Sequence, residues 1–150
     1  MLIEEILTPE SIKTNLESAD KISVIKELAG VLGAAYPEMK KDLVVKRVLE
    51  RERVGSTGLG DGVAIPHCKI PGLEFLMCCF GRSVQGIDFQ SADNQPAQLF
   101  FLIVAPENAA SVHLKALARI SRMCHKEEFR RAVLAAGTSQ DVWDLMKKED

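Results

Sequence analysis

Helices give way to strands within one stretch of the chain, Arg51-Glu52-Arg53-Val54-Gly55-Ser56-Thr57-Gly58-Leu59-Gly60-Asp61-Gly62-Val63-Ala64-Ile65-Pro66-His67. The stretch holds four of the ten glycines of the chain, and glycine is favoured where the backbone takes a positive φ or approaches a ligand closely. It begins with a cation, ends with an imidazole and has two hydroxyl groups between them. These features predict a cradle for a phosphate or another small anion. A flexible loop between a helix and a sheet is the alternative.

The stretch does not match two common phosphate-binding loops. A Walker loop needs a lysine after its second glycine, and this chain has no lysine between Lys46 and Lys69. A dinucleotide-binding loop needs Gly-x-Gly-x-x-Gly after a strand, whereas here Gly58-x-Gly60-x-Gly62 follows a predicted helix. His67 remains as a candidate nucleophile, because it follows a short apolar strand and its neutral form is populated near pH 7.

The first third of the chain predicts helices. Thr8 and Pro9 are typical of a helix N-terminus, with apolar residues at 12 and 16 on one face. Apolar residues at helical spacing predict a second helix from about residue 20 to Pro37 and a third over about 40–53. The stripe of the second helix comprises Ile22, Ile25, Leu28, Ala29 and Leu32.

The middle of the chain predicts strands. Residues 73–80 and 98–105 are apolar runs typical of strands covered on both faces, and residues 81–96 predict a hairpin or loop. Further helices follow: one capped by Ser111, one ending at Gly137, and one capped by Thr138 or Ser139. The sequence therefore predicts an α/β fold, a single layered domain over residues 1–150 with a mixed β-sheet flanked by helices.

Composition excludes several classes of function. The net charge of -2 and the 5% aromatic content do not favour binding to nucleic acid. The longest apolar run, Leu99–Ala105, is too short to insert across a membrane. Acidic residues near the N-terminus do not fit a signal peptide, so we expect a cytoplasmic protein with reduced cysteines.

A metal site is not predicted. Cysteine and histidine occur as three pairs of consecutive residues, namely His67-Cys68, Cys78-Cys79 and Cys124-His125. None has the spacing of a zinc site, and the cysteines in the apolar run read as small hydrophobic residues. His125 matches no motif and is predicted to lie on the surface.

A family resemblance joins two of these segments. The pattern from Arg51 to His67 resembles the active-site signature of the type-2 (mannitol/fructose class) IIA proteins of the bacterial phosphoenolpyruvate-dependent sugar phosphotransferase system. Ala105-Pro106 and the segment from His113 to Ser121 are similar to the second histidine segment of that family. The two histidines are 46 residues apart, as in such proteins. The resemblance implies the mannitol/fructose-type IIA fold.

The resemblance also implies roles for individual residues. The histidine that matches His67 accepts a phosphoryl group, with Nε2 as the expected atom, from the carrier protein HPr or its nitrogen-type paralogue. His113 matches the second histidine and is expected to bind phosphoryl oxygens, while Arg51 is expected to neutralise the transferred group. Phosphate contacts are also expected from Ser56, Thr57 and Gly58. No cofactor and no metal are implied.

Three functions remain open. The protein could regulate target proteins through its phosphorylation state, and the free-standing domain favours this nitrogen-type role. It could instead pass the phosphoryl group to a IIB domain for sugar uptake. The third reading is a module that binds an anion without covalent chemistry.

Overall fold

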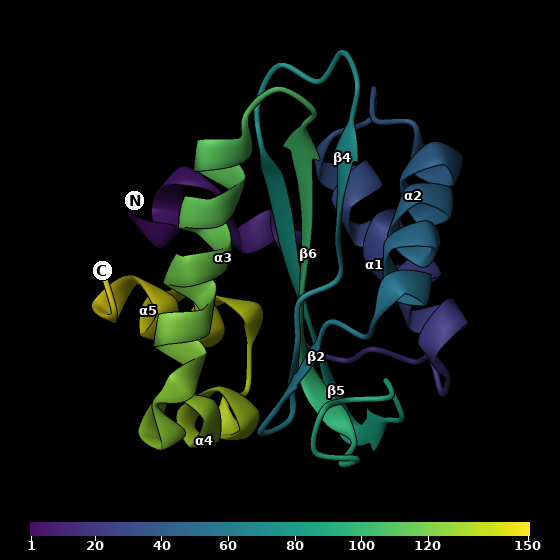
Figure 1. The fold of residues 1–150 in the computed structure, drawn as a ribbon. Coiled ribbons are helices and arrows are strands. Elements are labelled where there is room, and N and C mark those ends of the chain that lie inside the picture. Colours follow the sequence, from purple (N-terminus) through teal and green to yellow (C-terminus); the bar gives the residue numbers. More distant parts are fainter.

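The computed structural model describes residues 1–150 as two helical layers on either side of one sheet (Figure 1). Helices α1 and α2 cover one face of the sheet, and α3, α4 and α5 cover the other together with the N-terminal segment. The helices are α1 (Lys21–Ala35), α2 (Lys41–Val54), α3 (Ala110–His125), α4 (Glu127–Ala135) and α5 (Ser139–Lys148), with short 3₁₀ turns η1 (Ile3–Glu5) and η2 (Pro9–Ser11). The strands are β1 (Ile12–Lys13), β2 (Gly58–Gly60), β3 (Val63–Ala64), β4 (His67–Ile70), β5 (Met77–Ile87) and β6 (Ala97–Pro106).

Strand β6 is the centre of the mixed sheet. It pairs with β5 in antiparallel register, with Phe80 opposite Phe101, and its other edge pairs in parallel with both β3 and β4. The strand order is β1-β5-β6-β3-β2, with β4 also on β6. The mixed α/β fold predicted from the sequence is therefore confirmed.

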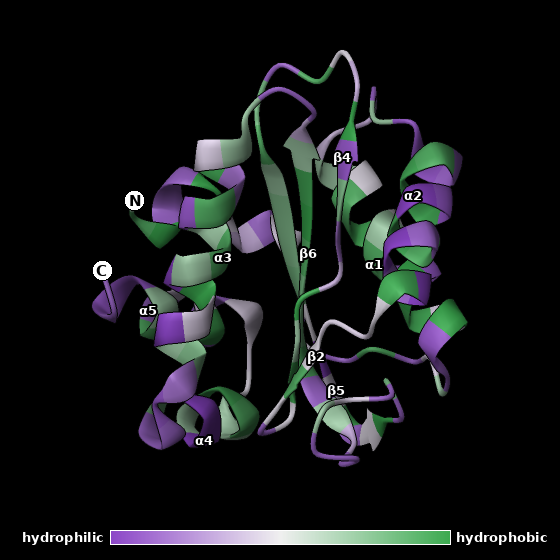
Figure 2. Ribbon diagram, in the orientation of Figure 1, coloured by the Kyte–Doolittle hydropathy of each residue, from purple (hydrophilic) through white to green (hydrophobic).

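Two cores lie on the two faces of this sheet. Alternate residues of a strand point to opposite faces, so Phe101 and Ile103 of β6 pack with α3–α5, while Phe100 and Leu102 pack with α1 and α2. Figure 2 shows the corresponding hydropathy: β5 and β6 are largely apolar, and the helices carry polar residues on their outer surfaces. The buried face of α1 comprises Val24, Ile25, Leu28, Ala29 and Leu32.

Side chains cap two of the helices, and of the two caps predicted for the last helix, Thr138 is the one observed. The Ser23 amide donates to the Asp20 carboxylate over 2.8 Å at the start of α1. The Asp141 amide donates to the Thr138 hydroxyl over 3.1 Å at the start of α5. Each cap satisfies a backbone donor that the helix itself leaves free. None of the helices is both long and apolar enough to cross a bilayer.

The N-terminal prediction was wrong. Residues 9–11 form only a 3₁₀ turn, and Ile12–Lys13 continue as a strand parallel to β5. Ile22 is also 53% exposed and lies outside the buried stripe of α1. Ser111 does not cap α3, because the helix already begins at Ala110 and Ala109 occupies the cap position.

The boundaries of β5 were also predicted wrongly. The strand begins at Met77 and runs through Gly81 and Arg82 to Ile87, where a hairpin or loop was predicted. Gly81 serves the packing of the strand rather than a turn, because a Cβ there would lie 2.8 Å from the side chains of Leu16 and Leu28. Arg82 can be buried because its guanidinium donates to the carbonyls of Thr14 and Val133.

Candidate functional site

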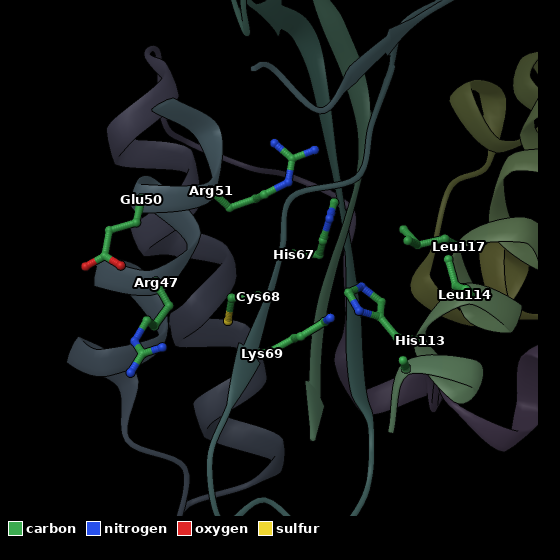
Figure 3. A pocket seen from close by; sticks show the side chains of 10 residues that line it. Arg47, Glu50, Arg51, His67, Cys68, Lys69, His113, Leu114 and Leu117 are labelled. Atoms are coloured by element: carbon green, nitrogen blue, oxygen red, sulfur yellow. The ribbon is translucent and has the colours of Figure 1, made fainter. Parts of the chain in front are cut away.

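A pocket of about 580 Å³ lies between the end of α2, strand β4 and the start of α3 (Figure 3). The chain topology brings its two histidines together. His67 begins β4 and pairs with Ile103 of β6. Strand β6 continues to Pro106, and α3 begins shortly after it at Ala110, so His113 lies in the first turn of the helix that follows β6. The pocket is lined by Arg47, Glu50, Arg51, His67, Cys68, Lys69, Ala110, His113, Leu114 and Leu117.

The His67 ring has a defined tautomer. Its Nδ1 lies 2.8 Å from the Ile65 carbonyl oxygen. Because a carbonyl oxygen only accepts hydrogen bonds, the proton is on Nδ1 and the lone pair is on Nε2. Burial lowers the pKa of His67 below its usual 6.5, the Ile65 bond opposes this, and the charge of Arg51 adds to it. The ring is thus neutral at pH 7, and its Nε2 has a free lone pair.

The second histidine is buried against the first. His113 is 5% exposed, and its Nε2 has no hydrogen-bond partner within the protein. The two rings meet edge to face, with centroids 5.0 Å apart. Burial, and then the charges of His67 and Lys69, lower the pKa of His113 to about 4. A buried nitrogen without a partner costs about 1–3 kcal/mol, so Nε2 of His113 would gain from a hydrogen-bond partner.

Cationic groups surround the histidines. Arg51, in the last turn of α2, donates from Nη1 to the Gly55 carbonyl over 2.9 Å and directs its guanidinium toward His67 (Figure 3). Lys69 extends toward the space beside both rings, whereas Arg47 and Glu50 point away from them. Ala110, the first residue of α3, also lines the pocket, and the positive end of that helix favours an anion.

Lys69 was missed in the sequence. It is two residues after His67 on a strand, and residues at this spacing share one face of a sheet. The period-two signal could therefore have placed its ammonium beside the imidazole once β4 was recognised as a strand.

The three residues predicted to bind phosphate, Ser56, Thr57 and Gly58, do not line the pocket. The Ser56 hydroxyl donates to the Phe89 carbonyl over 2.6 Å and accepts from the Gly58 amide over 3.0 Å. Thr57 donates to the Glu52 carboxylate from both its amide and its hydroxyl. Both hydroxyls thus already have partners within the protein. Direct phosphate contacts from these three residues stay a prediction.

Of the four cysteines, only Cys68 lines the pocket. No group of three or more histidine, cysteine, aspartate or glutamate side chains is placed to hold a metal ion. All four cysteines are buried and unpaired, and burial raises the pKa of the Cys68 thiol to about 12. His125 lies exposed at the end of α3, as predicted.

Comparison with known proteins identifies the family. Residues 5–149 match the family described as "Phosphoenolpyruvate-dependent sugar phosphotransferase system, EIIA 2". The chain belongs to this family. It is therefore an EIIA type-2 component for phosphoryl transfer, and the resemblance recognised in the sequence is confirmed.

Relatives of this EIIA chain fall into two functional groups. It is 40% identical over 150 residues to the fructose-specific EIIABC component of Bacillus subtilis, covering 100% of this chain but 24% of that protein. It is 38% identical over 146 residues to the nitrogen regulatory protein of Bradyrhizobium diazoefficiens, covering 97% of this chain and 95% of that protein. The chain therefore spans about a quarter of the first relative and nearly all of the second.

Solved structures share the fold of this EIIA chain. The nitrogen regulatory protein IIA-Ntr from Neisseria meningitidis superposes with a TM-score of 0.89 at 28% identity, covering 96% of this chain and 98% of that one. The mannitol IIA of Escherichia coli superposes with a TM-score of 0.78 at 20% identity, covering 93% and 97%. The sequence prediction of a mannitol/fructose-type IIA fold is confirmed.

Proposed function

We propose that Nε2 of His67 accepts a phosphoryl group from HPr or a nitrogen-type paralogue of HPr. The observation that carries this proposal is the bond from Nδ1 to the Ile65 carbonyl, which leaves the Nε2 lone pair free in a cationic pocket. During transfer an Nε2–P bond forms as the bond between phosphorus and the donor breaks. Nδ1 keeps its proton, so no proton has to leave His67. Positioning and charge neutralisation supply the catalysis.

The neighbouring groups would bind the transferred anion. His113 would donate from its unpartnered Nε2 to a phosphoryl oxygen, and the nearby negative charge would favour protonation of this imidazole. Arg51 can exchange its bond to the Gly55 carbonyl for a stronger one to the phosphoryl group, and Lys69 adds a second positive charge. Ser56, Thr57 and Gly58 would then act mainly by shaping the turn beside Arg51.

The phosphoryl group can also leave His67. Because Nδ1 remains protonated by its bond to Ile65, the imidazole departs as a neutral ring when Nε2–P breaks. The protein would thus store the group and transfer it onward. No cofactor or metal is needed for these steps.

We favour a nitrogen-type regulatory role in the cytoplasm, in which phosphorylation decides which target protein is bound. Support comes from the relative in Bradyrhizobium diazoefficiens and from the superposition with IIA-Ntr. The alternative is transfer to a IIB domain during sugar uptake, which the fructose-specific relative supports. A solved complex of mannitol IIA with phosphorylated mannitol IIB shows such a pairing for that protein. Binding of an anion without covalent chemistry is a third, less supported function.

Incubation with phosphoenolpyruvate, enzyme I and HPr tests the proposal. We expect one acid-labile, base-stable phosphoryl group on the wild-type protein and on the His125→Ala control, and none on His67→Ala. Labelling of His67→Ala at the wild-type level would contradict the assignment.

A second stage separates the two cellular roles. The phosphorylated protein is mixed with a fructose-type IIB domain, and a pull-down compares wild type with His67→Asp as a rough charge mimic. Rapid loss of the label to IIB indicates sugar transport. A retained label with target proteins captured by only one of the two forms indicates regulation.

A further inference from the structure

A buried carboxylate lies behind the candidate site. Glu52, in the last turn of α2, is 7% exposed and does not line the pocket. It accepts a hydrogen bond from the Thr57 amide over 3.2 Å and another from the Thr57 hydroxyl. Its charge is balanced by Lys21, the first residue of α1, whose Nζ lies 2.8 Å away. Glu52 therefore fastens the turn after α2 to the ends of two helices.

Hydrogen bonds continue from this carboxylate to the phosphoryl acceptor. The Thr57 carbonyl accepts from the Ile65 amide over 3.1 Å. The Ile65 carbonyl in turn accepts from Nδ1 of His67 over 2.8 Å. The connection thus runs from Glu52 through Thr57 and Ile65 to the imidazole without a gap.

We propose that Glu52 and Thr57 are positioning residues that fix the orientation and tautomer of His67 through Ile65. Ile65, which carries the critical carbonyl, is buried in the core between strands β3 and β4. Pro66 follows Ile65 and has no amide proton, so it cannot donate to the sheet. Its carbonyl accepts from the Ile103 amide over 3.0 Å on one side, and the bond from Ile65 to Thr57 holds the other side.

The ion pair explains how a carboxylate can be tolerated here. An unpaired negative charge one residue from Arg51 would oppose an incoming phosphoryl group. Lys21 compensates it and is itself held by a hydrogen bond of 3.2 Å to the Gln90 amide oxygen and by a position 4.7 Å from the centre of the Phe89 ring. The Ser56 hydroxyl donates to the Phe89 carbonyl. Residues 89–90 therefore support the turn after α2 at two points, through Lys21 and through Ser56.

Four variants test the positioning role. Thr57→Val removes the hydroxyl at nearly constant shape, Thr57→Ser restores it, and Glu52→Gln removes the charge and one of the two accepting oxygens. Asp42→Asn is the matched control, because Asp42 is an exposed carboxylate in the first turn of the same helix. Urea unfolding first establishes that each variant is folded, and the Thr57 pair decides the question if Glu52→Gln does not fold.

The first readout does not depend on phosphoryl transfer. Nitrogen-15 NMR of the unphosphorylated protein reports which ring nitrogen of His67 carries the proton. We expect the Nδ1–H form in the wild type, Thr57→Ser and Asp42→Asn, and a mixture of both tautomers in Thr57→Val and Glu52→Gln. An unchanged tautomer in the folded Thr57→Val and Glu52→Gln variants overturns the positioning role.

The second readout rests on the proposed function. In single-turnover phosphorylation by phosphorylated HPr, we expect the maximal rate to fall roughly tenfold in Thr57→Val and Glu52→Gln, with the half-saturating HPr concentration unchanged. A mere loss of stability would not produce this split. Wild-type rates in both variants overturn the proposal. If the wild type accepts no label, the proposed function fails and the tautomer measurement alone decides the positioning role.

Discussion

Acidification should destabilise the protein through His113, whose imidazole resists protonation in the folded state. Its pKa is lowered to about 4 by burial and by the charges of His67 and Lys69. An unfolded chain binds this proton near the ordinary value of 6.5, so between these two values the unfolded state carries more protons. Stability therefore falls as the pH falls through this window. Between pH 7 and pH 4.5 the loss assigned to His113 amounts to about 2 kcal/mol.

Urea unfolding at pH 7 and pH 4.5 measures this loss. The pH-dependent loss should be about 2 kcal/mol smaller in His113→Gln than in the wild type, and unchanged in His125→Gln, whose imidazole is exposed. The measurement stops at pH 4.5 so that Glu27 does not add to the result. The pKa of Glu27 is lowered to about 2, so the stability that its carboxylate contributes is lost below pH 4.5. Equal losses in His113→Gln and wild type, or an NMR titration of His113 near pH 6.5, would refute the reasoning.

Three further substitutions test other parts of the account. Arg82→Met should lower the free energy of unfolding by roughly 2–5 kcal/mol in urea, because the carbonyls of Thr14 and Val133 lose their donor; a change below about 0.5 kcal/mol would contradict this. Gly58→Ala should cost about 1–3 kcal/mol in the same assay, since its Cβ would lie 2.8 Å from the Ser91 Cα; wild-type stability would show that the turn is free to move. Arg51→Ala should slow phosphorylation in stopped-flow labelling while the melting curve is retained, and labelling at the normal rate would remove its clamping role.

The helices were largely predictable from the sequence because their signals are local. Apolar periodicity located α1 and α2, and the cap at Thr138 marked the start of α5. The strand errors arose where distant packing decides the structure. Gly81 and Arg82 look like turn residues locally, but the glycine accommodates Leu16 and Leu28, and the arginine bonds to carbonyls far away in the chain.

The site was predictable only in part for the same reason. The family resemblance located His67, His113 and Arg51, and the structure brings all three to one pocket. Lys69 was overlooked because the short strand β4 was not recognised. Glu52 was overlooked because it lies among the alternating charges of residues 50–53, which look like an exposed helix end, although its carboxylate is buried between α2 and α1.

The central claim is that Nε2 of His67 is the atom that carries the phosphoryl group. Heteronuclear NMR of nitrogen-15-labelled protein, phosphorylated with phosphoenolpyruvate, enzyme I and HPr, tests it most directly by detecting coupling between phosphorus and a ring nitrogen. We predict coupling to Nε2 of His67 alone, with Nδ1 still bearing its proton toward the Ile65 carbonyl. Coupling to Nδ1 of His67, or to either nitrogen of His113, would contradict the account.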